Sequence, residues 1–457
     1  MIVIVLAVVA GVACYQGAQL ISPAIINNKT LNVWFGADCP RVFRDMAIYD
    51  APHFRTGVHP LFLLLTFPPV YLLTKALSIE PLTGVRLFIA IVSCLWISTL
   101  FILLRLITLR RLDATLFSIL GAVSAAAVFW FVVPETYSVG SLSILLALCF
   151  VALTQHQQFS WLWYVAINAL TLSFTVTNWM VGLFATLVNH RRKRFLQIAL
   201  SGLFLVGVLA LVQKVFFPTA GLKNMVDQRG EMQYLFSPES GGPLQVVKSF
   251  VAHSLVIPAI QVVKSNEPDS MNLLVMLTQN SRPGSGSLWG AVAVVLWIAL
   301  LGLGLWSLFS VKEHLKLRMV LGLSLVGQLT LHALYGSETF LYSLHFAPLL
   351  VVLAALSTLT QARSLALVLV SILIVSTAIN NGLQFNKARE HINLYDRAPS
   401  GLSRQDVRSQ MQQRPSDLWF HDMRQVVLTA PGICQLDRTT SPANERFSCI
   451  ENEKSYL

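Results

Sequence analysis

The chain has 457 residues, of which 55% are hydrophobic and only 12% are charged. Soluble globular proteins carry about 25% charged residues, so this composition excludes an ordinary soluble enzyme. Apolar stretches long enough to cross a bilayer recur from the first residue to about residue 381. The net charge is +11, but the basic residues form short clusters between apolar stretches, so nucleic acid is not expected as a partner. The sequence therefore predicts an all-α polytopic membrane protein.

About eleven membrane-spanning helices are expected. They are predicted at residues 1–22, 84–107, 113–133, 139–155, 158–176, 177–190, 196–216, 287–309, 318–335, 344–360 and 363–381. The first lacks the basic n-region and cleavage site of a signal peptide, so we interpret it as a retained span.

Lys and Arg concentrate in alternate connections between these spans, at residues 105–111, 191–194, 312–318 and 363. By the positive-inside rule these connections are cytoplasmic. The N-terminus is then cytoplasmic and the C-terminus periplasmic or extracellular. Segment 59–78 is apolar enough to span, but a crossing there would move every later basic cluster outside. We therefore predict a juxtamembrane or re-entrant helix on the outer face, broken by Pro68 and Pro69.

Three polar regions share the predicted outer side. We divide the chain into a membrane domain, residues 1–381, with outer loops at 23–83 and 217–286, and a polar tail or small domain at 382–457. Two tail cysteines, Cys434 and Cys449, are close enough in sequence for a disulfide in an oxidising compartment, or both are free thiols.

The first outer loop carries the densest charge before the tail, with Asp38, Asp45, His59 and several arginines. If residues 39–50 are helical, Asp38 and Asp45 lie two turns apart on one face and can address one cavity. One carboxylate can then act as a general base on a hydroxyl, or hold a divalent cation. The alternative is structural: Asp38 caps the helix and Asp45 pairs with Arg41 or Arg44.

Further candidates lie at the outer ends of later spans, where polar groups beside apolar surface are costly and often functional. A shared outer cavity of Asp38, Asp45, Glu135, Glu338 and His345 would explain these groups together. Structural alternatives are an interfacial turn at the aromatic belt and helix caps. The substrate-binding candidates are His59, Arg86, Glu135, Tyr137, Asn178, Arg229, Glu338 and His345.

Arg86 and the loop cations Lys223, Arg229, Lys248 and Lys264 are candidates for binding a phosphate, although solvated loop lysines are the simpler interpretation. The sequence has no CxxC, HExxH, GxSxG or P-loop motif, so zincins, serine hydrolases and NTP-driven pumps have no support. The two halves show no convincing repeat, which weakens an inverted-repeat transporter.

Taken together, these features resemble the membrane-embedded GT-C glycosyltransferases, in the branch of lipid A aminoarabinose transferase, protein O-mannosyltransferases and Rgt-type lipopolysaccharide-core transferases. The resemblance lies in Asp38 in the outer loop, His59-Pro60 at a juxtamembrane helix, Arg86 near the next span and the turn at 134–138. It also includes the large loop at 217–286. It covers about residues 1–300, and beyond them only the general architecture agrees.

The resemblance implies a GT-C-like bundle with outer juxtamembrane helices in a bacterial inner (plasma) membrane. The donor is a polyprenyl-phosphate-linked sugar, the acceptor an envelope glycan, lipid or protein, and the reaction occurs on the periplasmic face. Asp38 is the implied base, and Asp45 orients the acceptor or a cation. Because Cys39-Pro40 follows Asp38 in place of a second acidic residue, a paired-carboxylate metal site is in doubt, and no other cofactor is expected.

Two alternatives stay open. One is a lipid-linked glycan polymerase or ligase, which should carry paired arginines and a His in the long loop, where residues 217–286 offer Arg229, Arg282 and His253. The other is a transporter or flippase of glycan precursors without catalysis.

Overall fold

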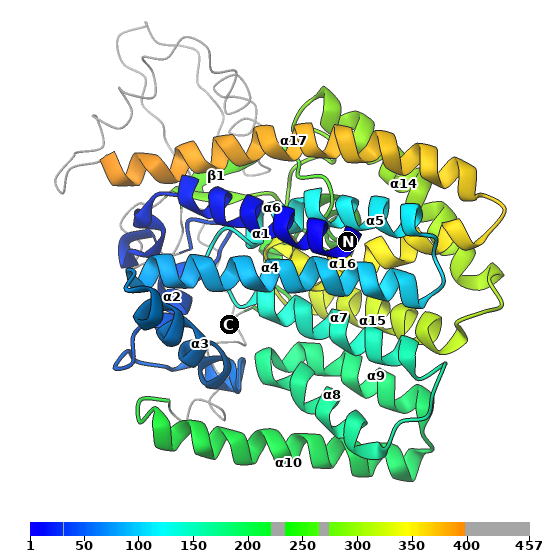
Figure 1. The fold of residues 1–457 in the computed structure, drawn as a ribbon. Helices are drawn as coiled ribbons and strands as arrows, with labels where there is room; N and C mark the ends of the chain where they lie inside the picture. Colours follow the sequence, from blue (N-terminus) through cyan, green and yellow to red (C-terminus); the bar gives the residue numbers. More distant parts are fainter. Residues whose placement is uncertain (31, 221–233, 265–273, 398–457) are drawn as a thin grey trace, which may run out of the picture. The chain divides into compact units, whose positions relative to one another are not determined.

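The computed structural model describes residues 1–30, 32–220, 234–264 and 274–397. The chain divides into two units, residues 1–397 and 398–457, and the second lies outside the described residues. So do Cys434 and Cys449. The first unit is mostly helical (Figure 1).

The α-helices are α1 Ile2–Leu20, α2 Cys39–Ala47, α3 Phe62–Leu77, α4 Pro81–Leu106, α5 Arg111–Val123, α6 Ala125–Trp130, α7 Tyr137–Leu153, α8 Trp161–Phe174, α9 Trp179–Asn189, α10 Arg192–Phe216, α13 Pro243–Lys248, α14 Leu288–Ser310, α15 Leu315–Leu334, α16 Ser343–Ala355 and α17 Arg363–Arg397. Short helical turns are η1 Pro23–Ile26, η2 Asn28–Thr30, η3 Arg55–Gly57, η4 Val176–Asn178, η5 Pro238–Ser240, η6 Ser249–His253, η7 Thr339–Tyr342 and η8 Leu356–Leu359. The strands are β1 Gln261–Lys264 and β2 Leu274–Leu277.

Seven helices in the described part are long and apolar enough to cross a membrane, and four shorter apolar helices accompany them. The predicted all-α polytopic fold is thus confirmed, whereas the number of eleven spans stays a prediction. Long helices pack side by side: α1 on α4, α4 on α7, α8 on α10 and α14 on α17. Many side chains on the outer surfaces of these helices are exposed and apolar, as expected of a lipid-facing surface.

Segment 59–78 forms the helix α3, and the prediction that Pro68 and Pro69 break it is wrong, because both lie inside a continuous helix. Each proline removes one N–H from the helical ladder. The backbone stays helical on both sides of the prolines, and Thr66 Oγ1 and Thr74 Oγ1 also donate to the carbonyls of Phe62 and Val70 at 2.7 and 2.8 Å.

The predicted span at 113–133 is interrupted at Ser124, between α5 and α6. Ser124 Oγ accepts from Ala127 N at 3.2 Å and so caps α6. Residues of the long loop enter at the same place, because the carbonyls of Leu255 and Ser254 accept from the amides of Ala125 and Ala126 at 2.9 and 3.0 Å. The break exists because a distant segment satisfies the amides that helix continuation would have used.

The loop at 217–286 is therefore not a simple outer connection. Its residues 254–257 are buried, and its two strands pair antiparallel, with Val262 opposite Met276. Met276 N also donates to the Val33 carbonyl at 3.0 Å, so this loop contacts the first outer loop. Two predicted outer regions thus meet, while their side of the membrane stays a prediction.

The last helix, α17, continues to Arg397, well past the predicted end at residue 381. Its polar extension finds partners in the long loop. Gln384 Nε2 donates to the Gly286 carbonyl at 2.7 Å, and His391 Nε2 lies 3.0 Å from the Leu274 carbonyl. Helix α17 is thus held by the loop it passes (Figure 1).

Gly304 allows α14 to pack tightly on α16. A Cβ there would lie 2.5 Å from the Leu353 carbonyl oxygen and 2.7 Å from Ala354 Cα, both backbone atoms that cannot rotate away. Gly304→Ala is therefore expected to destabilise the protein by about 1–3 kcal/mol. Thermal unfolding in detergent measures this effect. The control is Gly302→Ala on the same helix, where a Cβ meets nothing within 4 Å; equal melting temperatures of the two variants would contradict the prediction.

Candidate functional site

The first outer loop folds around the short helix α2. The helix begins at Cys39, with Asp38 at the N-cap position and Pro40 in the first turn, where the missing N–H of proline costs nothing. It ends at Ala47, three residues before the predicted end. The Asp38 side chain makes no capping hydrogen bond, so the capping role considered from the sequence is not the one observed.

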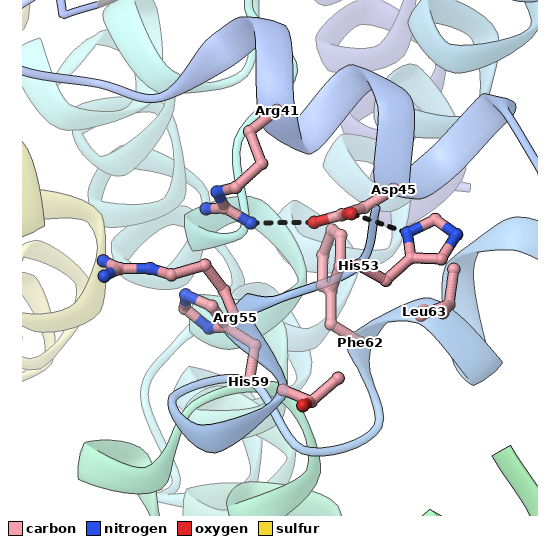
Figure 2. A pocket seen from close by; sticks show the side chains of 8 residues that line it. Arg41, Asp45, His53, Arg55, His59, Phe62 and Leu63 are labelled. Carbon is pink, nitrogen blue, oxygen red and sulfur yellow. Dashed lines mark hydrogen bonds and ion pairs between the residues drawn. The ribbon is translucent and has the colours of Figure 1, made fainter. Parts of the chain in front are cut away.

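Arg41 joins the two predicted carboxylates, and Figure 2 shows its contact with Asp45. Its Nε donates to Asp38 Oδ2, and its Nη1 donates to Asp45 Oδ2 at 2.7 Å. Asp38 and Asp45 thus lie on one helix face, as predicted, and the predicted pairing of Asp45 with Arg41 is also present. Burial lowers the pKa of Arg41, but the carboxylates of Asp38 and Asp45 outweigh burial and raise it. Arg41 therefore stays charged.

The chain of polar contacts continues from Asp45 to His53. Asp45 Oδ1 lies 2.8 Å from His53 Nδ1, and His53 Nε2 lies 3.2 Å from the Tyr49 carbonyl. The side chains of Arg41, Asp45 and His53 are 4%, 9% and 2% exposed, whereas that of Asp38 is 28% exposed. Of the two carboxylates bonded to Arg41, Asp38 is therefore the one that a substrate can reach.

A small pocket lies between α2, the segment at 53–59 and the start of α3 (Figure 2). Its lining combines cationic, histidine and apolar side chains: Arg41, Asp45, His53, Arg55, Thr56, His59, Phe62 and Leu63. Two arginines that can bind an anion, Arg41 and Arg55, thus lie next to the apolar side chains of the first turn of α3.

The contacts of His59, which lines this pocket, determine which of its ring nitrogens carries the proton. Its Nδ1 lies 2.8 Å from the Phe174 carbonyl, an acceptor, so Nδ1 carries the proton and Nε2 carries the lone pair. Burial lowers the pKa of His59, and the nearby charges of Arg41 and Arg55 lower it further. The ring is therefore neutral at physiological pH.

Glu135 links this loop to the turn before α7. Its Oε1 accepts from the backbone N–H of Asp38 at 3.3 Å, and its Oε2 accepts from the N–H of Thr136. Glu135 is 3% exposed; burial raises the pKa of its carboxyl, and the charge of Arg41 opposes this rise. The structure thus brings Glu135 next to Asp38, as the sequence predicted for the acidic groups.

Tyr137, Asn178 and His345 gather at the N-terminal end of α7. The rings of Tyr137 and His345 form an edge contact with centroids 5.3 Å apart. Asn178 Nδ2 donates to the Gly140 carbonyl at 3.1 Å. These three predicted residues are neighbours, although none lines the pocket.

Glu338 holds the long loop. Its Oε2 accepts from the N–H groups of Thr278 and Gln279 at 2.8 and 2.9 Å, and its Oε1 accepts from Thr278 Oγ1 at 2.7 Å. Burial raises the pKa of Glu338, and these hydrogen bonds offset only part of that rise. Of the five groups assigned to a shared outer cavity, Asp45 alone lines the described pocket.

Glu338→Gln is expected to loosen the loop. The amide N–H₂ of glutamine is a donor and cannot accept the hydrogen bonds that Thr278 and Gln279 donate to the second carboxylate oxygen. The cost is about 1–3 kcal/mol, seen as faster tryptic cleavage after Lys264, which is followed by Ser265. Glu239→Gln, at an exposed position of the same loop, should cleave at the wild-type rate. Identical cleavage of all three proteins would show that Glu338 does not anchor the loop.

Arg86 lies elsewhere, where its Nη2 donates to the Ile21 carbonyl at 2.7 Å just beyond the end of α1. Arg229 and Lys223 lie outside the described residues. The roles predicted for these cations stay predictions.

The sequence analysis gave no catalytic or binding role to Arg41, His53 or Arg55. All three line the pocket. The feature of the sequence that pointed to them is the high density of charged residues at 38–59. Helix α2 and the segment at 53–59 bring these residues together in the folded protein.

No group of three or more His, Cys, Asp or Glu side chains in the described part is placed to hold a metal ion. Both carboxylates on α2 are bonded to Arg41, so they do not form the paired site that a divalent cation would need.

No protein-family model and no curated protein matches the sequence. Among solved structures, the apo oligosaccharyltransferase of Archaeoglobus fulgidus is similar to this chain, with 14% sequence identity and a TM-score of 0.47. The likeness covers 98% of this chain and 62% of that one, so this chain spans less than two thirds of the length of that structure. Identity and TM-score this low support no argument about the protein.

Proposed function

We propose that the chain is an inverting glycosyltransferase that takes a sugar from a polyprenyl-phosphate donor. The acceptor is a hydroxyl of an envelope glycan, lipid or protein on the non-cytoplasmic face. One observation carries the proposal: the partly exposed Asp38 ends a buried chain of charged groups beside a pocket containing Arg55 and His59. The GT-C resemblance of the sequence motifs supports the same function.

The proposed reaction is a single displacement. The acceptor oxygen attacks the anomeric carbon while Asp38 takes the hydroxyl proton. The bond between the anomeric carbon and the phosphate oxygen breaks, and its electron pair leaves with the lipid phosphate. Arg41 and Arg55 stabilise the charge that develops on this leaving group. Such a donor is already activated, so the reaction needs no nucleotide-binding motif.

Asp38 is aligned for this role by its neighbours. Arg41 is fixed by Asp45, which is fixed by His53, so the guanidinium cannot turn away from Asp38 without breaking its buried bond to Asp45. The Glu135 carboxylate holds the backbone of Asp38. A base held in this way loses little conformational freedom when the acceptor arrives.

The lipid part of the donor is proposed to follow α3. Phe62 and Leu63 at the start of this helix line the pocket. An apolar chain on this surface leaves its phosphate beside the arginines.

Mass spectrometry of envelope glycans from cells with and without the protein tests the function. Loss of one sugar residue without the protein is expected, and it identifies both sugar and acceptor. Unchanged glycans with an altered distribution of carrier lipid across the membrane would contradict the proposal and favour a transporter.

A further inference from the structure

Three buried polar atoms at the N-terminal end of α7 have no hydrogen-bond partner among the residues that the structure describes. They are Thr136 Oγ1, Asn178 Oδ1 and His345 Nε2. Their residues are 1%, 0% and 2% exposed. Buried polar groups in native proteins are almost always bonded, so a cluster of exceptions indicates a missing partner such as a ligand or water.

The three atoms come from different elements but surround one turn of helix. Thr136 occupies the N-cap position of α7, and its carbonyl accepts from Gly140 N at 3.1 Å. A Cβ on Gly140 would lie 2.8 Å from His345 Nε2 and 3.0 Å from Asn178 Nδ2. The first turn of α7 thus brings Thr136, Asn178 and His345 together.

This cluster adjoins the charged site. Thr136 follows Glu135, whose carboxylate binds the backbone of Asp38. On the other side, Asn178 N donates to the Thr175 carbonyl at 3.0 Å, and Thr175 Oγ1 lies 3.2 Å from Nδ1 of His59, which lines the pocket. The cluster therefore lies beside the proposed base and the proposed phosphate pocket, and not at a remote point of the bundle.

The unpartnered atoms define what can bind. A threonine hydroxyl donates and accepts, an amide oxygen accepts, and an imidazole nitrogen does either according to its tautomer. None of the three groups is a carboxylate or a permanent cation, unlike Arg41 and Arg55 in the pocket. A neutral group with several hydroxyls matches this set, because each hydroxyl can serve as donor or acceptor.

We infer that Thr136, Asn178 and His345 form a subsite for the hydroxyl groups of the donor sugar, next to the phosphate pocket. This inference rests on the proposed function and adds the recognition of the sugar to it. The phosphate pocket binds any polyprenyl phosphate, and the subsite distinguishes a lipid that carries a neutral sugar from the bare lipid phosphate.

Two variants each remove one of the three unpartnered atoms. Thr136→Val deletes a hydroxyl that bonds to nothing in the described protein. His345→Phe deletes Nε2 and keeps a ring against Tyr137. The matched control is Ser118→Ala on α5, which also removes a buried hydroxyl without a partner in the described residues. If the cluster were only structural, Thr136→Val would leave lipid binding unchanged and would stabilise the fold.

The full-length protein in nanodiscs is titrated with undecaprenyl phosphate and with undecaprenyl phosphates carrying glucose, galactose, mannose or arabinose. The wild type and Ser118→Ala are expected to prefer at least one sugar-bearing lipid over the bare lipid. Thr136→Val and His345→Phe should each reduce that preference about tenfold, the effect of one lost hydrogen bond. Their affinity for the bare lipid phosphate should not change.

The failures are distinguishable. If both variants keep the wild-type preference, or if the wild type binds bare and sugar-bearing lipids equally, the subsite is wrong while lipid-phosphate binding stands. If the wild type binds none of the lipids, the proposed function fails together with the subsite.

Discussion

Asp38→Asn is expected to lower sugar transfer by about 100- to 10,000-fold, the usual contribution of a general base. Asparagine keeps the size of the side chain and an oxygen that can accept from Arg41 Nε, so the charged chain on α2 should still assemble. It cannot take the proton of an acceptor hydroxyl. The loss should therefore be one of turnover and not of folding.

The measurement is mass spectrometry of envelope glycans from cells that produce each variant at equal level, with size-exclusion chromatography to establish that the protein folds. Asp50→Asn is the matched control, since Asp50 is an exposed carboxylate of the same loop. Glycans of the Asp50 variant should be those of the wild type. Full transfer by Asp38→Asn would remove Asp38 from the role of base.

Arg41→Met is expected to destabilise the protein by about 3 kcal/mol, because removing one partner of a buried ion pair leaves the other charge uncompensated. Methionine fills similar space. Asp45 would keep His53 but lose its guanidinium partner, Asp38 would lose its alignment, and transfer should fall as well. Thermal unfolding in detergent gives the change in stability.

Two further variants make this result specific. Arg44 lies about one turn from Arg41 on the same helix. Arg44→Met removes a contact with Asn28 at the surface and should change the stability by less than about 1 kcal/mol. Adding Asp45→Asn to Arg41→Met removes the uncompensated carboxylate and should restore part of the lost stability. If the loss of stability in the double variant equals the sum of the losses in Arg41→Met and Asp45→Asn, the two residues are not coupled.

The sequence determined the class of the protein and the loop that holds the candidate site. Membrane-spanning character is a local property of about 20 successive residues, so it can be read without knowing any neighbour. The helical spacing of Asp38 and Asp45 is local as well, and the structure has both on one face of α2. The charge of residues 38–59 marked the loop in which the pocket lies.

The tertiary structure decided which of these groups meet and what they do. Arg41 is the centre of the site because it bonds to both Asp38 and Asp45, and Glu135, which is far away in sequence, binds the backbone of Asp38. The break at Ser124 and the extension of α17 beyond residue 381 depend on hydrogen bonds from the long loop. Such contacts replace or complete the local helical pattern, and no local pattern encodes the partner that a distant backbone segment will supply.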